Sequence, residues 1–181
     1  ASLANGININ GGNTDVTSNT MTGTVGDAVL VTAASGVDID NNTIIGGLAN
    51  GVHIVGGALI GVTGNNIGGT AGAGILSSGT TDLTVDDNTL IATGLTNNAD
   101  AIHVDTATNA QVKKNTVIGT GGNGIYVNSN GGSVSGGNSI VGAAKNAIQL
   151  DNSTGVDVSG NIVLGAAQDG VAVTGGADNT V

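Results

Sequence analysis

Few residues of this 181-residue chain can take part in acid–base chemistry, and several of them fall into one spacing pattern. The chain has two histidines, His53 and His103, and one tyrosine, Tyr126. Asp105 follows His103 by two residues, and Tyr126 follows His103 by 23. Imidazole, carboxylate and phenol groups are suited to proton transfer and to binding a sugar. His103, Asp105 and Tyr126 are therefore candidate catalytic residues. The candidate carbohydrate-binding residues are His53, His103, Tyr126 and Asn128.

A group of aspartates forms a second candidate site. Asp38 and Asp40 flank Ile39, so both carboxylates point to the same side of an extended strand. Asp15 precedes Asp38 by 23 residues. Carboxylate oxygens are the ligands that Ca²⁺ prefers, so Asp15, Asp38 and Asp40 are candidate calcium ligands. Calcium is the one cofactor that the sequence brings forward.

The composition excludes several classes of protein. Aromatic residues make up 1 % of the chain, cysteine and proline are absent, and the formal net charge is -10. Nucleic-acid binding is not expected, because it needs a basic surface. A thiolate metal site or disulfide scaffold needs cysteines, and no apolar run is long enough to span a membrane. Abundant glycine with almost no long charged side chains also disfavours a helical protein.

The elements that must position these residues follow a repeat. An asparagine recurs at spacings of 23, 23, 23, 27, 23 and 23 residues, so the period is strict apart from one four-residue insertion. If equivalent asparagines stack, each side-chain amide can donate to the carbonyl of the next and form a structural ladder. The marker asparagines of this ladder are Asn19, Asn42, Asn65, Asn88, Asn115, Asn138 and Asn161.

Apolar residues obey the same period. Each repeat has three short segments in which apolar residues alternate with polar ones, separated by Gly, Asn, Asp and Thr turns. One repeat cannot bury its apolar side alone, but stacked copies can, each strand pairing with its copy one coil on. The sequence therefore predicts an all-β, single-stranded parallel β-helix of about seven coils, roughly 34 Å long at about 4.8 Å per coil. Ser135 breaks one apolar column beside Val134, which predicts a local bulge.

The same register places further polar residues. Lys113 and Lys114 lie 27 residues after Asp86 and Asp87, so we expect two cross-strand charge pairs of about 0.2–1 kcal/mol each. The loop 93–100 holds the insertion and is expected to wall a pocket beside the His103 strand. A second polar column precedes that strand in each repeat, and we expect tight turns with left-handed backbone there. It consists of Asp27, Asn50, Ala73, Asp100, Asn123, Asn146 and Asp169.

Threonines and branched aliphatics form an outward stripe. If the residue two after each marker points inward, its two neighbours point outward, unless the short strands coil and turn some of them in. An exposed apolar stripe usually marks an interface. A regular threonine lattice is also a feature of ice-binding solenoids, although Asn66 and Gly68 interrupt it here. The outward positions are Thr20, Thr43, Asn66, Thr89, Thr116, Ser139 and Ile162, with Thr22, Ile45, Gly68, Ile91, Ile118, Val141 and Leu164.

The 23-residue register, from about residue 5 to 181, resembles the parallel β-helix repeat family of right-handed, pectate-lyase-like solenoids. The resemblance implies right-handed coils with three short strands each. It also implies that clustered aspartates with Ca²⁺ and a basic residue can perform β-elimination on a polysaccharide. The chain has no arginine, so that base would be Lys113 or Lys114. The family includes lyases, hydrolases, epimerases, tailspikes and passive adhesin stalks, so the fold alone does not define the activity.

These observations favour a structural, non-catalytic solenoid at the outside or surface of a bacterial cell, as an adhesin stalk or fibre segment. The alternatives are a polysaccharide-binding or lyase-like module and an ice-binding solenoid. The pattern begins and ends part-way round a coil, so we expect residues 1–181 to be one domain cut from a longer solenoid or stacked end to end. The expected partners are flanking repeats or other copies at the open coil ends, with polysaccharide as a further candidate.

Overall fold

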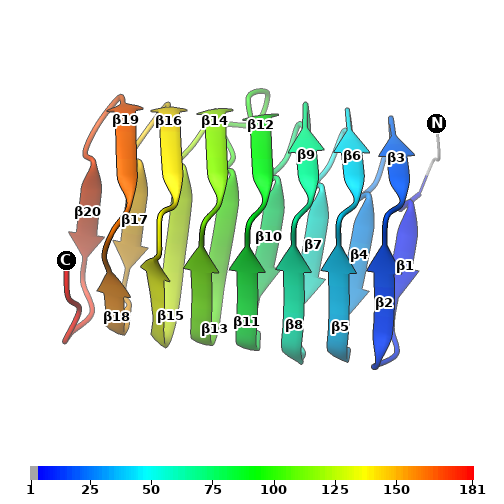
Figure 1. Cartoon of the computed structure of the whole chain (residues 1–181), viewed down its shortest axis with the longest axis horizontal. Helices are drawn as coiled ribbons and strands as arrows, with labels where there is room; N and C mark the ends of the chain where they lie inside the picture. Colours follow the sequence, from blue (N-terminus) through cyan, green and yellow to red (C-terminus); the bar gives the residue numbers. More distant parts are fainter. Residues whose placement is uncertain (1–3) are drawn as a thin grey trace.

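The computed structural model describes residues 4–181, whose strands wind into a stack of coils (Figure 1). A regular coil contains three strands, and in two coils a single long strand, β13 or β15, runs through two faces. Every strand pairs in parallel with its equivalents in the neighbouring coils. The predicted all-β parallel solenoid of about seven coils is therefore confirmed. No helix occurs in residues 4–181, and so none that is long and apolar enough to cross a membrane.

Three faces run along the stack, each named here after its first strand. The β1 face consists of β1 (Ile7–Ile9), β4 (Val29–Thr32), β7 (Val52–Val55), β10 (Ile75–Ser78), the first part of β13 (Ile102–Lys113), the first part of β15 (Ile125–Ser135), β17 (Ile148–Asp151) and β20 (Val171–Thr174). The β2 face consists of β2 (Thr14–Thr17), β5 (Ser35–Asp40), β8 (Ala58–Thr63), β11 (Thr81–Asp86), the later parts of β13 and β15, and β18 (Thr154–Val158). The β3 face consists of β3 (Thr20–Thr22), β6 (Thr43–Ile45), β9 (Asn66–Gly68), β12 (Thr89–Thr93), β14 (Thr116–Thr120), β16 (Ser139–Ala143) and β19 (Ile162–Ala166).

The core is a column of branched aliphatics. Strand alternation sends one residue in two to the inside, where equivalent residues stack coil on coil, as Val52 stacks on Val29. A narrow interior is filled by such side chains without large aromatics, which explains the composition. The largest fully buried side chains are Ile39, Ile44, Ile54, Ile60, Ile67, Ile75, Leu83, Leu90, Ile102, Ile125, Ile140 and Ile148.

The sharp corner between the β2 and β3 faces has the same backbone conformation in every coil. The residue just before the marker asparagine adopts a positive φ, as in Asn41 (54°), Asp87 (55°) and Lys114 (53°). A left-handed residue reverses the direction of the chain within one position, and glycine or asparagine adopts it at low cost. The corner therefore recurs with the 23-residue period of the sequence.

Two coils depart from the regular period. Val134 pairs with Val112 and is buried, so the extra residue lies at the following corner, where Gly136 and Gly137 both have positive φ. Ser135 itself pairs in register with Lys113, and the register shift between β13 and β15 lies between Val104 and Ala107. The bulge predicted beside Ser135 is therefore wrong in its place. The four-residue insertion forms a turn at residues 94–98, which ends in a hydrogen bond from Ala99 N–H to Gly94 O.

Candidate functional site

The marker asparagines lie at the β2–β3 corner and bond to one another along the stack. Each Nδ2 donates to Oδ1 of the next asparagine at 2.8–3.1 Å, from Asn19 through to Asn161. The same Oδ1 also accepts the backbone N–H of the preceding asparagine in five of these links. Because Asn42 to Asn138 are buried, this ladder satisfies amides that would otherwise lose water at a cost. Its role is structural.

The second polar column lies at the corner between the β3 and β1 faces. Here the side-chain oxygen of one coil accepts the backbone N–H of the next, as Asp27 Oδ1 accepts from Asn50 and Asn123 Oδ1 from Asn146. The left-handed backbone expected at this column is wrong, because none of its described residues has a positive φ. Five of these residues accept a backbone N–H of the next coil, and Ala73 has no side-chain oxygen to offer.

Both histidines bind aspartates of this second column. His53 Nδ1 lies 2.8 Å from Asp27 Oδ2, and His103 Nδ1 lies 2.7 Å from Asp100 Oδ2. Each aspartate uses its other oxygen to accept a backbone N–H of the neighbouring coil. Sequence reasoning placed these aspartates in a column but missed their pairing with histidine, for which the three-residue spacing from Asp100 to His103 was the available signal.

His103 and Tyr126 stack on adjacent coils, with ring centroids 4.3 Å apart and an interplanar angle of 11°. The Tyr126 hydroxyl donates to Asp151 Oδ2 at 3.0 Å. Burial of the phenol is the largest of the effects that raise the pKa of Tyr126 to about 12, and this hydrogen bond and the charge of Asp151 make smaller contributions in the same direction. The phenol is therefore protonated at neutral pH and cannot serve as a base there.

Asp105 does not join the two rings in a triad. Its Oδ1 accepts a hydrogen bond from Asn128 Nδ2 at 3.2 Å, and its Oδ2 accepts one from Thr106. His103 and Tyr126 are neighbours, as the spacing predicts, but their hydrogen-bonded carboxylates are Asp100 and Asp151 rather than Asp105. An outward strand residue reaches along the stack to another coil as readily as to its own strand neighbours.

The ring faces on the β1 face are turned toward neighbouring coils. Tyr126 covers one face of His103, and Leu76 is its strand partner on the other side. Leu76 also separates His103 from His53, so the two histidines do not meet. A sugar ring stacks on an aromatic face, whereas this column offers ring edges to solvent.

A shallow hollow of about 300 Å³ opens beside His103. The insertion loop contributes Asn98 and Ala99 to its lining, as expected of a loop that walls a pocket, and Lys145 lies at its border. Leu76 and Ala73 add apolar surface. The hollow thus combines a carboxylate–imidazole pair, an amine and an apolar floor.

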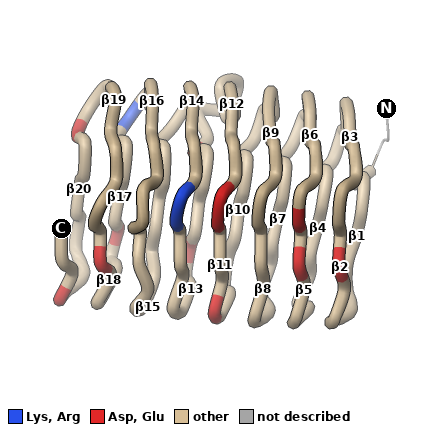
Figure 2. The backbone as a smooth tube through the Cα atoms, viewed as in Figure 1, with Lys and Arg blue, Asp and Glu red and all other residues tan. Residues whose placement is uncertain are grey.

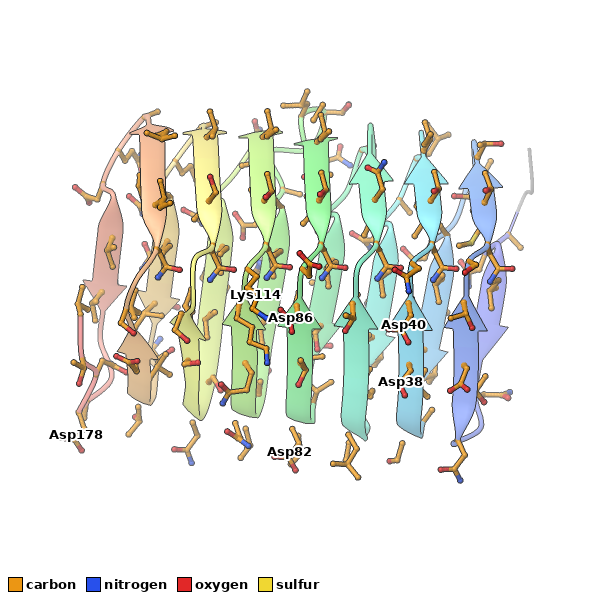
Figure 3. The ribbon with its side chains drawn as sticks, viewed as in Figure 1. Asp38, Asp40, Asp82, Asp86, Lys114 and Asp178 are labelled. Atoms are coloured by element: carbon orange, nitrogen blue, oxygen red, sulfur yellow. The ribbon has the colours of Figure 1, made fainter. Side chains whose placement is uncertain are left out.

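The three candidate calcium ligands lie on one side of the β2 face. Asp15 pairs in register with Asp38, and Asp38 and Asp40 project outward from β5 (Figure 3). Burial, then the charges of Asp38 and Asp15, raise the pKa of Asp40. In residues 4–181, no group of three or more acidic or histidine side chains is arranged to hold a metal ion. The aspartates are neighbours that repel one another, and they do not form a calcium cage.

Both neighbouring lysines turn to one aspartate. Lys113 Nζ lies 3.5 Å from Asp86 Oδ2. Lys114 Nζ lies 3.9 Å from Asp86 Oδ1, and Figure 3 shows Lys114 beside Asp86. The pairing of Lys113 with Asp86 is confirmed, and that of Lys114 with Asp87 is wrong. Asp87 and Lys114 occupy the left-handed corner, where side chains splay away from the strand direction. Lys113 is engaged by a carboxylate and is not placed as a free base beside His103.

Comparison with known proteins bears on the fold. A family model described as a right-handed β-helix region matches residues 2–140 and 95–181, which together span almost the whole chain. No curated protein matches the sequence. The repeat, the parallel coils and the family match agree, and the chain belongs to the right-handed β-helix family.

Proposed function

We propose that this chain is a structural, non-catalytic solenoid that acts outside a bacterial cell, as a stalk or fibre segment. The observation that carries the proposal is the use of its polar side chains. The buried asparagines are consumed in coil-to-coil bonds, and the imidazole, phenol and Lys113 groups are each held by an aspartate. This use of polar groups in bonds between coils supports a rigid stack.

The partners we propose are further solenoid coils, on the same or another chain. A parallel strand edge presents unpaired N–H and C=O groups that another coil can continue. In the coil that contains β19 and β20, the equivalents of core residues are only partly covered, and Val173 is 47 % exposed. A further coil on this side would bury them as Leu150 is buried one coil earlier.

Surface labelling tests the location, and polymer digestion tests the lack of catalysis. Antibodies raised against the chain should label intact cells of its source as strongly as permeabilised cells. Labelling only after permeabilisation would overturn an extracellular role. Incubation with uronate polymers and added Ca²⁺ should release no unsaturated product detectable by ultraviolet absorbance. Release of such product would overturn the non-catalytic proposal.

A polysaccharide-binding module is the second candidate function. The observation in its favour is the hollow beside His103, which offers the donors and acceptors of Asp100 and Lys145 next to Leu76. Calorimetric titration with neutral and acidic polysaccharides tests it, with His103→Ala as the variant and His53→Ala as the control outside the hollow. Heat that disappears only in His103→Ala supports binding there.

An ice-binding surface is the third candidate. The outward threonines of the β3 face are at least partly exposed and lie on a regular stack of strands. Asn66 and Gly68 interrupt the rows at β9. Thermal hysteresis and ice-crystal shaping measure this activity directly, and their absence at high protein concentration would remove it.

A further inference from the structure

The β3 face carries two outward columns of different chemistry, neither of which is buried. The first outward residue of its strands is mostly Thr, Ser or Asn, and the second is mostly aliphatic. None of these residues turns into the core, so the whole stripe faces solvent. Exposed fractions in the aliphatic column reach 53 % for Ile45, 42 % for Ile91, 43 % for Ile118 and 60 % for Leu164.

The β3 face is also free of charge. The chain carries 13 acidic residues and three lysines, yet no strand of this face contains any of them. Figure 2 shows the strands of the β3 face in tan, while acidic positions lie on strands of the β2 face. Two copies of a molecule with net charge -10 repel each other, and least so through an uncharged face. The charge distribution therefore selects this face for contact between copies.

We infer that the β3 face binds the β3 face of a second copy, with the two solenoid axes antiparallel. The twofold axis would lie in the interface, parallel to β12, so that Ile91 of one copy meets Ile91 of the other. A rotation about the strand direction keeps the position along each strand, so the hydroxyl column meets a hydroxyl column and the aliphatic column meets an aliphatic column. The inference holds wherever the protein is located, and so goes beyond the proposed function.

Residue size along the aliphatic column fits this arrangement. With Ile91 on the axis, Gly68 of one copy faces Ile118 of the other, so a missing side chain lies opposite a protruding one. Ile45 faces Val141, so two branched aliphatic side chains meet there. In the hydroxyl column Asn66 faces Thr116, where amide and hydroxyl can exchange hydrogen bonds. The interruptions at β9 therefore become complementary to β14.

The size of the face predicts a weak dimer. Seven strands at about 4.8 Å spacing make the face roughly 34 Å long. Two outward columns along that length, from two copies, bury on the order of 1,000 Å², which is the lower end for a specific interface. We therefore expect a dissociation constant in roughly the micromolar range, well above that of an obligate dimer. Because the copies repel overall, salt should strengthen association.

Sedimentation over a range of concentrations tests the dimer, with Ile91→Asp as the variant. Two carboxylates meeting on the axis should raise the dissociation constant by roughly 100-fold. Leu59→Asp is the matched control, because Leu59 is 64 % exposed on another corner and has a positive φ of 56°. Asp82 occupies the equivalent position one coil on, with a φ of 52°, so the control is expected to fold and dimerise normally.

Cross-linking tests the antiparallel geometry, and the chain has no cysteine of its own. Facing sheets lie about 10 Å apart, so a short bis-maleimide suits the distance better than a disulfide. The Ile91→Cys thiol of one copy should cross-link to the same thiol of the second copy. Ile45→Cys should not, because four coils, roughly 19 Å, would separate the two thiols. The double variant Ile45→Cys with Val141→Cys should cross-link.

Three outcomes would overturn the inference. These are a monomer at all concentrations and salt levels, a dimer that Leu59→Asp weakens as much as Ile91→Asp does, and efficient cross-linking by Ile45→Cys alone. Circular dichroism of each variant confirms that the coils are intact, since all of the substituted side chains point outward. Thermal hysteresis in a protein that stays monomeric would assign the face to ice instead.

Discussion

Two polar columns run the length of the stack at different corners, and they tolerate different residues. At the β2–β3 corner every marker residue is asparagine, whereas the β3–β1 corner holds aspartate, asparagine and alanine. Both columns supply an oxygen to a backbone N–H of a neighbouring coil. They differ in direction, because the ladder oxygen serves the coil before it and the oxygen of the second column serves the coil after it.

The difference lies in the number of bonds demanded of each side chain. A ladder asparagine must also donate, as Asn88 Nδ2 does to Val62 O, Asp86 O and Asn115 Oδ1. Carboxylate cannot donate, so aspartate is excluded there. The second column asks at most for one acceptor, and Ala73 supplies none. The other oxygen of Asp27 and Asp100 is therefore free to bind a histidine. Residue types therefore vary, and the candidate site lies, at the corner where the fold requires fewer side-chain hydrogen bonds.

Asn88→Asp should have the largest effect and tests the comparison directly. The substitution replaces a buried donor by a carboxylate oxygen that faces three acceptor oxygens, and it brings in a buried charge without a cation. We expect a loss of about 3–5 kcal/mol in the free energy of unfolding, measured by denaturant titration. The same change in the second column, Asn123→Asp, keeps the acceptor that Asn146 N–H uses but adds a charge beside Asp100, and should cost about 1–2 kcal/mol. Equal losses in the two variants would break the comparison.

Asp100→Ala should have the next largest effect. It leaves the Asn123 N–H, which Asp100 Oδ1 accepts, without its partner in a buried corner. We expect a loss of about 1–3 kcal/mol in the free energy of unfolding. Asp100→Asn retains an acceptor oxygen and should lose less than Asp100→Ala. A larger loss in Asp100→Asn would mean that the charge held against His103, rather than the acceptor, is what stabilises this corner.

The outward pair of Tyr126 and Asp151 should have a smaller effect, which depends on pH. Its pKa of about 12 lies above the value of 10.0 for a free phenol, so the folded state favours the protonated form. The resulting stabilisation should be complete below pH 10 and be lost as pH rises from about 10 to about 12. As the one aromatic residue, Tyr126 can be titrated by phenolate absorbance. Asp151→Asn should move the pKa down toward 10, and an unchanged titration would contradict the role given to Asp151.

The lysine pairs should have the smallest effect. Lys113 is 40 % exposed and Lys114 is 61 % exposed, so solvent screens both pairs with Asp86. Lys113→Ala should lower the free energy of unfolding by about 0.2–1 kcal/mol, and Lys114→Ala by less. Both losses should shrink at high salt. A loss in Lys113→Ala as large as that in Asn88→Asp would show that surface charge, rather than the ladder, determines the stability of the stack.

The coil register was predictable because every coil must bury and hydrogen-bond equivalent residues. The inward positions and the marker asparagines follow from the spacing, since a stack must satisfy equivalent residues in equivalent ways. The register shift between Val104 and Ala107 does not. The partners of His103, Tyr126 and Lys114 were not predictable in this way. Asp100, Asp151 and Asp86 take them instead of Asp105 and Asp87. Outward side chains have several neighbours within reach, and local burial decides among them.

The sequence by itself therefore determined the period, the parallel stacking and the core, because apolar burial and backbone hydrogen bonding repeat in every coil. Only the tertiary structure decided which acid holds each histidine and where the hollow opens. It also showed that the β3 face stays open to solvent. These outcomes depend on rotamers, on the insertion at residues 94–98 and on contacts between coils 23 to 27 residues apart, none of which the spacing alone specifies.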